Sequence, residues 1–113
     1  MRIYPPTNVT AINITSSSVV LQWKPYAGDA SLLGYNLLVL EQGSKDQNLT
    51  QLKGDSFNLN VCANVTMLKI GNLSSFTRYC VQIRLITKMG NGDLSECYFF
   101  YTKGVNVKGI VVT

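Results

Sequence analysis

The sequence lacks histidine altogether, and only 14% of its 113 residues are charged. Histidine is the commonest general base and the commonest metal ligand, so its absence removes the usual groups for acid–base catalysis and metal binding. No apolar run approaches the roughly 20 residues that a membrane-spanning helix needs. The N-terminus also lacks the apolar segment of a secretory signal, so we expect either a chain without one or a domain of a larger chain. We predict no enzyme activity, no cofactor, no metal site and no direct insertion into a membrane.

What the chain does contain is enough apolar material for one folded domain, since 46% of its residues are hydrophobic. Its net charge of +4 raises the question of a polyanionic partner. The basic residues stand singly along the chain rather than in a stripe or motif, so we predict no nucleic-acid binding. A weak heparin-like contact through Arg84, Lys88 and Lys103 is left open, because neighbouring strands could bring these side chains together.

Short stretches rich in Val, Ile, Leu and Tyr alternate with polar residues and are divided by Gly, Asn, Asp, Ser and Pro. This period of two indicates β-strands, and no segment of ten residues keeps a helical stripe. We predict strands near residues 8–14, 18–24, 34–41, 49–53, 65–70, 78–87 and 95–102, with a hairpin loop over 89–93. Seven strands favour an all-β domain, an antiparallel two-sheet sandwich.

The tripeptide Asn-x-Ser/Thr, the acceptor of N-linked glycans, occurs at Asn8, Asn13, Asn48, Asn64 and Asn72. The frequencies of Asn, Ser and Thr predict about 1.6 such sites by chance. The excess indicates a secreted or cell-surface protein, in which these five asparagines carry glycans. The alternative is that Asn and Thr are simply common in turns and strands.

Several motifs in the expected order resemble a fibronectin type III domain, an immunoglobulin-like sandwich. They lie in residues 6–9, 15–23, 34–39, 73–79 and 90–95. The fourth, Leu-Ser-Ser-Phe-Thr-Arg-Tyr, is similar to the family's L-x-P-x-T-x-Y tyrosine corner, with Ser75 where the family has proline. The resemblance spans residues 5–103, which we take as the domain, and leaves 104–113 as a tail, linker or extra strand.

The resemblance implies structural roles for the large side chains of these motifs. Trp23, Tyr35, Leu73 and Tyr79 are expected in the core, where an aromatic ring is buried and its polar tip finds a partner. Tyr79, at the start of the sixth strand, would return its hydroxyl to the backbone upstream.

Three cysteines, Cys62, Cys80 and Cys97, permit three single pairings. In the resembling fold, Tyr79 and Val81 point inward, so Cys80 points outward. By the same alternation Cys97 points outward on the neighbouring strand, and we prefer the pairing Cys80–Cys97. Such a bridge is also similar to the membrane-proximal domains of class II cytokine receptors and tissue factor. Cys62 would then be free and buried, or bonded to a neighbouring domain, or would replace Cys80 in the pairing.

Apolar residues also alternate onto the outer face of the sheet that holds these cysteines, where polar ones are expected. The predicted partner-binding residues are Leu38, Leu40, Ile86, Phe99 and Tyr101, with Gly90, Asn91, Gly92 and Asp93 of the hairpin loop. Clustered apolar residues on a solvated face indicate a contact with a partner or a neighbouring domain. The alternative is a slip of one residue in register, which would turn them inward.

The sequence thus predicts a non-catalytic extracellular module of a cell-surface receptor or adhesion protein, which binds another protein or spaces neighbouring domains. One alternative is the ligand-binding domain of a cytokine-receptor-like protein. Another is an accessory spacer domain of a secreted enzyme.

Overall fold

The computed structural model describes residues 3–28, 31–44, 56–105 and 111–112, and within these ranges it contains strands but no helix. The strands are β1 (Thr10–Ile14), β2 (Val19–Gln22), β3 (Leu32–Ser44), β4 (Ser56–Cys62), β5 (Met67–Ile70), β6 (Thr77–Thr87), β7 (Gly90–Asn91), β8 (Tyr98–Tyr101), β9 (Gly104–Val105) and β10 (Val111–Val112). No helix in the described part of the chain is long and apolar enough to cross a membrane.

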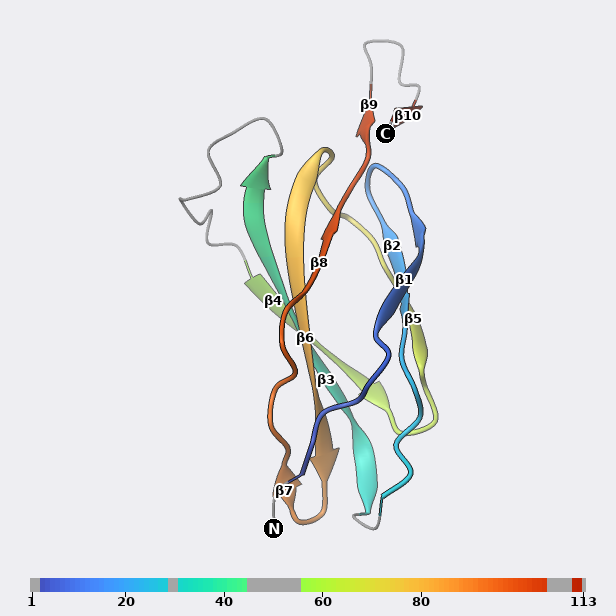
Figure 1. The fold of residues 1–113 in the computed structure, drawn as a ribbon, viewed down its shortest axis with the longest axis vertical. Coiled ribbons are helices and arrows are strands. Elements are labelled where there is room, and N and C mark those ends of the chain that lie inside the picture. The colour runs from blue at the N-terminus through green and yellow to red at the C-terminus, as the bar shows by residue number, and fades with distance from the viewer. Residues whose placement is uncertain (1–2, 29–30, 45–55, 106–110, 113) are drawn as a thin grey trace.

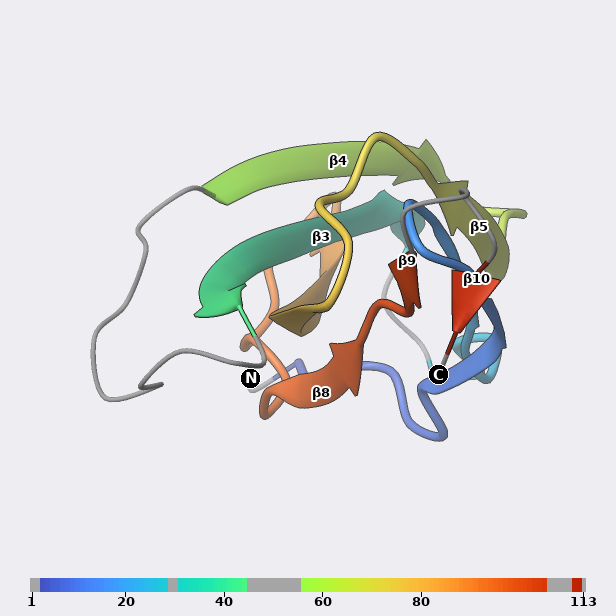
Figure 2. The ribbon, with the colours of Figure 1, turned by 90° about the horizontal axis from the view of Figure 1, so that it is seen from above.

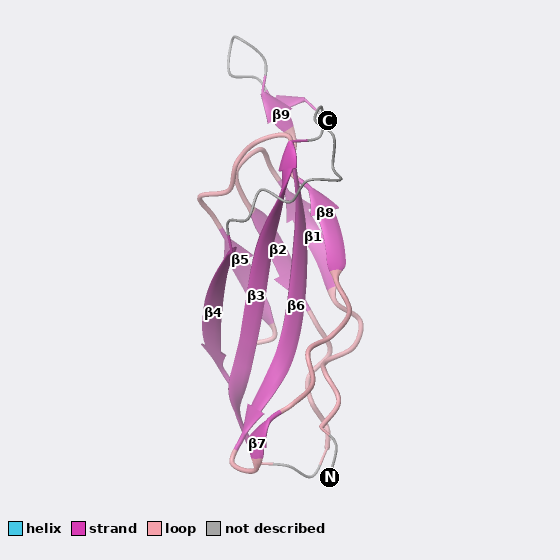
Figure 3. Ribbon diagram, turned by 90° about the vertical axis from the view of Figure 1, so that its left-hand side faces the viewer, coloured by secondary structure: helices cyan, strands magenta, loops and turns pink. Residues whose placement is uncertain are grey.

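Two antiparallel sheets form a sandwich. One sheet has the order β1-β2-β5; the other has the order β4-β3-β6-β7, with β8 also pairing with β6. Figure 1 shows the long strands β3 and β6 running most of the length of the molecule, and Figure 2 shows the same sandwich from above. Figure 3 shows the larger sheet in front of the smaller one. The predicted all-β two-sheet sandwich is therefore confirmed.

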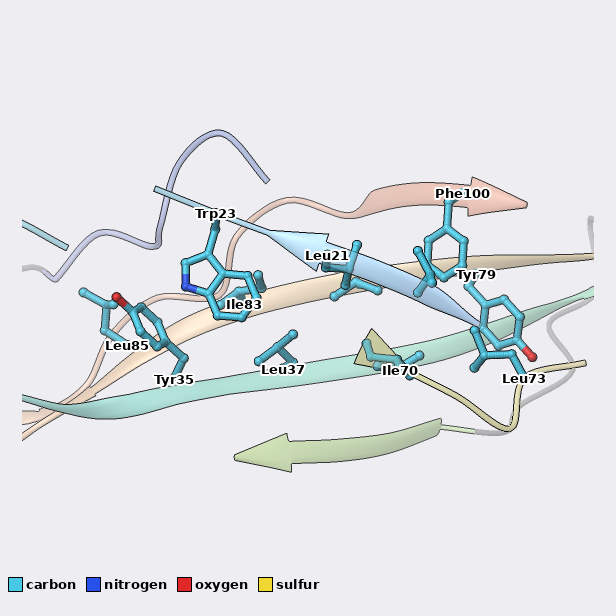
Figure 4. Close-up of a cluster of buried hydrophobic side chains, with 13 residues drawn as sticks. Leu21, Trp23, Tyr35, Leu37, Ile70, Leu73, Tyr79, Ile83, Leu85 and Phe100 are labelled. Carbon is cyan, nitrogen blue, oxygen red and sulfur yellow. The ribbon is translucent and has the colours of Figure 1, made fainter. Parts of the chain in front are cut away.

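Alternation along three strands builds the core between the sheets. Every second residue of β2, of β6 and of the middle of β3 points inward and is buried, and the view in Figure 4 shows these side chains meeting between the layers. They are Val19 and Leu21 of β2, with Trp23 just after it; Tyr35, Leu37 and Val39 of β3; and Tyr79, Val81, Ile83 and Leu85 of β6. Ile70, Leu73 and Phe100 complete the cluster, so all four predicted core residues are in place.

The strand predicted near residues 49–53 lies outside the described residues, and the structure contains a strand that the sequence did not predict. This is β4, which begins at Ser56, in the interval between the strands predicted near 49–53 and 65–70. β4 pairs with β3 from Leu40↔Ser56 to Gly34↔Cys62. Its residues do alternate, but the alternating polar positions are Asn58 and Asn60, and asparagine is typical of turns. The burial of Leu59 and Val61 against β3 outweighs that preference.

The predicted last strand and its hairpin loop also differ in the structure. β6 turns back at Lys88 and Met89, and Gly90 and Asn91 already form β7, paired with Thr87 and Ile86. The prediction of a loop over 89–93 was thus wrong in its extent. The last strand of the sandwich, β8, begins only at Tyr98, because residues 92–97 form no regular strand, although Gly92 and Ser95 still hydrogen-bond to β6.

The two ends of the described chain lie at opposite ends of the sandwich. Ile3 lies beside Gly92, next to β7, whereas Gly104 follows β8 at the other end, as Figure 1 shows. Beyond it, β9 pairs antiparallel with β10, and these two strands form a small sheet of their own.

Candidate functional site

A disulfide joins β6 to the residue that precedes β8. The Cα atoms of Cys80 and Cys97 are 5.3 Å apart, and their sulfurs are bonded, so the predicted pairing is confirmed. Cys62 is free and exposed at the end of β4, so of the three alternatives, a buried thiol and a replacement of Cys80 in the pairing were wrong. Cys80 points away from the core as predicted, yet it is fully buried, because its neighbours on the outer face cover it.

The strand register shows which side chains share that outer face. Leu40, Cys80 and Phe99 lie side by side on β3, β6 and β8, and Leu38 lies one step further along β3, opposite Gln82. Tyr101 lies opposite Arg78, one step the other way. We name the group Leu38, Leu40, Phe99 and Tyr101 the outer patch. It covers the disulfide on the face of the larger sheet that is turned toward the viewer in Figure 3.

The outer patch combines half-buried aliphatic residues with exposed aromatic rings. Leu38 and Leu40 are half-buried, whereas Phe99 is 44% exposed and Tyr101 is 38% exposed. The guanidinium carbon of Arg78 lies 4.1 Å from the centroid of the Phe99 ring, which is close enough for a cation–π interaction. Sequence reasoning missed Arg78, although its alternation with Cys80 places it on this face.

Ile86 and the hairpin residues, which the sequence grouped with the outer patch, lie elsewhere on the same face. Ile86 pairs with Gly34 and Asn91, six residues along β6 from Cys80 and hence about 20 Å away. A polar row separates the two groups: Arg84 lies opposite Asn36, whose side-chain amide donates a hydrogen bond of 2.9 Å to Asn60.

The hairpin residues are partly occupied by contacts within the domain. The Asp93 amide donates to the backbone oxygen of Ile3 over 2.9 Å, and the Gly92 amide donates to that of Leu85 over 2.8 Å. A Cβ on Gly92 would lie 2.9 Å from Ile3, so this glycine lets the N-terminal segment approach. The exposed tip of the hairpin is formed instead by Lys88 and Met89.

The three cations considered for a heparin-like contact are not brought together. The Phe76 amide donates to the backbone oxygen of Lys103, which places this lysine at the β8 end of the sandwich. Arg84 lies eight residues along β6 from Phe76, roughly 25 Å away, and Lys88 lies further still, in the turn. The idea that neighbouring strands bring these three side chains together, on which the open possibility rested, was therefore wrong.

The four described acceptor asparagines are all exposed, and all lie away from the outer patch. Asn13 belongs to β1 in the smaller sheet, and Asn8 precedes that strand. Asn64 lies in the turn between β4 and β5, and Asn72 lies in the connection from β5 to β6. Asn48 lies outside the described residues.

Tyr79 forms the predicted tyrosine corner. Its hydroxyl accepts a hydrogen bond of 2.7 Å from the Ser74 amide and donates one of 3.1 Å to the Glu41 carboxylate, which the Ser74 hydroxyl also contacts over 3.3 Å. Burial raises the pKa of Tyr79, the Ser74 hydrogen bonds lower it, and the nearby Glu41 carboxylate raises it again, so that the net shift is upward. Glu41 was missed from the sequence, because nothing local links it to a residue 38 positions later.

The other predicted core aromatic residues pack as a pair. The Trp23 and Tyr35 rings meet edge to face with their centroids 5.4 Å apart, and the Tyr35 hydroxyl accepts a hydrogen bond of 3.3 Å from the Tyr26 amide. The indole nitrogen of Trp23 is buried and has no hydrogen-bond partner among the described residues. The expectation that this polar tip is satisfied was therefore wrong.

Comparison with known proteins agrees with this geometry. The family model of the Fibronectin type III domain matches residues 4–100. The chain belongs to the fibronectin type III family. Domains of this family are generally non-catalytic modules, and in adhesion proteins they contact other proteins and neighbouring domains.

The curated relatives are large proteins that contain such domains. The human cell adhesion molecule DSCAM is 28% identical over 103 residues, which cover 88% of this chain and 5% of that protein. Rat phosphatidylinositol phosphatase PTPRQ is 30% identical over 96 residues, which cover 81% of this chain and 4% of that protein. This domain thus spans only a twentieth or less of the length of these relatives.

Solved structures show the same fold. The third fibronectin III domain of human KIAA0343 protein matches with a TM-score of 0.76 and 21% identity, covering 94% of this chain and 86% of that one. The FN5 domain of Drosophila Lar matches with a TM-score of 0.67 and 24% identity, covering 89% and 99% respectively.

Proposed function

We propose that this domain is a non-catalytic, extracellular protein–protein interaction module of a cell-surface receptor or adhesion protein. The relatives support this proposal, because they are adhesion molecules and phosphatases that carry fibronectin type III domains. The disulfide between Cys80 and Cys97 supports the extracellular location, because such bonds persist in oxidising compartments. We take residues 5–103 as the domain and 104–113 as a tail, linker or extra strand.

The outer patch is the proposed contact surface, and the exposure of its two aromatic rings is the observation that carries the proposal. Phe99 and Tyr101 project from β8 beside the disulfide, which holds that strand to β6. Rigid aromatic side chains over a fixed backbone lose little conformational entropy on binding, and aromatic residues and arginine dominate binding energies. Arg78, which lies over the Phe99 ring, fits a partner that presents carboxylates around an apolar centre.

The positions of the acceptor asparagines support the same surface. A glycan covers the protein around it, so a face that contacts another protein must be free of glycans. The four described acceptor sites lie on the smaller sheet or in turns and connections, and none of these four is on the outer patch.

A second role, as a spacer, is favoured by the positions of the two ends. Because Ile3 and Gly104 lie at opposite ends of the sandwich, consecutive domains of this kind would extend in a line (Figure 1). The spacer role requires no contact surface, so the experiment must separate the two.

The test adds a glycan to the proposed surface. Phe99→Asn with Tyr101→Thr creates an acceptor tripeptide around the buried Phe100. Gln22→Asn with Lys24→Thr creates a matched one around the buried Trp23, on the exposed face of the other sheet. Each secreted chain is tetramerised, and its binding to a panel of mammalian cells is measured by flow cytometry.

We expect the glycan at position 99 to raise the concentration needed for half-maximal binding at least tenfold. The glycan at position 22 should leave that concentration unchanged. Mass spectrometry confirms occupancy, and thermal unfolding confirms that both variants fold. Equal binding by both variants would contradict the outer patch as the contact surface. A parent chain that binds no cell of the panel would favour the spacer role.

A further inference from the structure

The sandwich has an open groove at the edge that β4 forms, one strand away from Leu40 of the outer patch. It lies between the end of β3, the start of β4 and the connection from β5 to β6, and its volume is about 480 Å³, within the range of about 300–1,000 Å³ that holds small ligands. Glu41, Ser56, Phe57, Asn72, Ser74 and Tyr79 line it, together with Gly71 and Leu73.

An aromatic ring forms the apolar part of this groove. Phe57 pairs with Val39 and therefore lies on the core-facing side of β4, yet it is 39% exposed. It remains exposed because β4 is the edge strand and the smaller sheet ends at β5. A second hollow, of about 230 Å³, continues from Phe57 and Gly71 between β4 and β5. The open edge of the sandwich thus has room beside the ring.

Polar groups surround the ring. One oxygen of the Glu41 carboxylate accepts hydrogen bonds from the hydroxyls of Tyr79 and Ser74, at 3.1 Å and 3.3 Å, and among the described residues these are its hydrogen-bond donors. The Ser74 side chain is exposed, whereas that of Ser56 lies on the outer face, because Ser56 pairs with Leu40. An aromatic face surrounded by hydroxyl and carboxylate groups suits a sugar, whose C–H faces pack on rings while its hydroxyls form hydrogen bonds.

The residue that would carry a sugar is itself part of the groove wall. Asn72 lines the groove, is exposed, and begins the tripeptide Asn72-Leu73-Ser74. Its φ of 61° is in the left-handed region, which asparagine tolerates better than most residues. We propose that the groove seats the N-linked glycan of Asn72, whose first sugars pack on Phe57 and hydrogen-bond to Glu41. This inference rests on the extracellular location proposed above.

The modification itself requires a lipid-pyrophosphate-linked oligosaccharide as the sugar donor. The Nδ2 atom of Asn72 forms a bond to the anomeric carbon of the first sugar, and the bond from that carbon to the pyrophosphate oxygen breaks. The lipid pyrophosphate leaves with the bonding electrons, and the amide loses one proton to the base of the transferring enzyme. No oxidation or reduction is involved.

Seating the glycan makes it part of the folded domain. A seated glycan stabilises the native state and is ordered, whereas a glycan on an open surface such as that of Asn64 does neither. The glycans of Asn72 and Asn64 should therefore differ in their order and in their effect on stability, and both differences can be measured in the same domain.

The experiment uses the chain secreted from mammalian cells with single acceptor sites. One chain keeps Asn72, with Asn8→Gly, because Asn8 has a φ of 58°, and Asn→Gln at positions 13, 48 and 64. The control chain keeps Asn64 and carries Asn72→Gly. Nuclear Overhauser effects between labelled sugars and the Phe57 ring report contact, and enzymatic trimming of the glycan reports its effect on the thermal midpoint.

In the Asn72 chain we expect contacts between the first sugars and the Phe57 ring, and a fall of about 4 °C in midpoint on trimming. The control chain should show neither. Phe57→Leu removes the ring, and Gly71→Val places a side chain where a Cβ would meet nothing within 4 Å. Either variant should remove the contacts and most of the fall in midpoint.

Occupied Asn72 without contacts and without a change in midpoint would overturn the inference and leave the proposed function intact. So would an unmodified Asn72 in a chain whose other acceptor sites carry glycans. If no acceptor site of the natural sequence carries a glycan after secretion, the extracellular location is contradicted, and this inference falls with it.

Discussion

The side chain of Tyr79 contacts several separate elements of the fold. Its ring stacks on Phe100 with centroids 5.5 Å apart, and its hydroxyl connects the Ser74 amide to the Glu41 carboxylate. The residue therefore ties β6 to β8, to the end of β3 and to the connection that precedes β6. The ring belongs to the core, and the hydroxyl satisfies groups that would otherwise lack a partner.

We predict that Tyr79→Phe lowers the free energy of unfolding at neutral pH by about 1–2 kcal/mol, because it leaves the Ser74 amide and the Glu41 carboxylate each without one partner. Chemical denaturation at pH 7 measures this difference. Tyr101→Phe, on the outer patch, is the control, and we expect a change within about 0.5 kcal/mol, as for surface substitutions in general.

The raised pKa of Tyr79 adds a pH dependence to that difference. An acid whose pKa is raised by folding stabilises the native state below its unfolded value, near 10.0, and loses that contribution as the pH rises through the folded value. The gap in stability between the parent chain and Tyr79→Phe should therefore be constant up to about pH 9 and shrink at pH 11. A gap that stays constant to pH 11 would contradict the raised pKa.

At the scale of the strands, β2, β3 and β6 were predictable from the sequence, and β4 was not. Core residues such as Leu37 and Ile83 alternate without interruption, and burying that one face decides the strand. In β4 the same alternation is carried by Leu59 and Val61 between asparagines, so the local preference and the tertiary contact disagree. Only the pairing with β3 shows which of the two prevails.

Register explains why the candidate site was predicted only in part. Alternation correctly places Leu38, Leu40, Phe99 and Tyr101 on one face, because it depends only on position along a strand. It does not fix how far β8 is shifted along β6, and that shift separates the outer patch from Ile86. The contact between Ile3 and Gly92 joins segments 89 residues apart and leaves no local signal.

Gly34 limits how closely β3 and β4 can pair. A Cβ at this position would collide with the backbone oxygen of Val61, an atom that cannot move without its strand. We predict that Gly34→Ala lowers the free energy of unfolding by about 1–3 kcal/mol, as overpacking does in cores. Chemical denaturation measures the loss, and hydrogen exchange should show it concentrated in β4.

The matched control for this change is Gly71→Ala, since a Cβ there would meet nothing within 4 Å. We expect its effect to stay within about 0.5 kcal/mol. If both alanines cost the same amount, the loss would reflect the general difference between glycine and alanine rather than the close approach at Val61.

At the scale of the whole molecule, the proposed protein contact and the proposed glycan contact lie on different parts of the surface. The outer patch has no described acceptor asparagine, whereas the edge of the sandwich at β4 holds the groove with Asn72. One sandwich can therefore present a protein-binding face and a glycosylated face at the same time. The added glycan at position 99 and the single-site chains test the two faces separately.

The disulfide described above also limits how far the domain can be stretched. A pull applied between its two ends acts along the sandwich, and once the strands separate, the residues from Cys80 to Cys97 remain closed in a loop. The sequence separation of 17 residues, at about 3.5 Å each, means that the bridge keeps roughly 60 Å of chain from extending.

In single-molecule pulling, the oxidised domain should therefore lengthen by about 50–60 Å less than the reduced one, after allowance for the 5.3 Å that the bridge itself spans. Equal lengths would mean that the bridge does not form in the folded chain. In a fully extended array of such domains, each disulfide that is reduced would thus add about 50–60 Å to the length of the array, without breaking the chain.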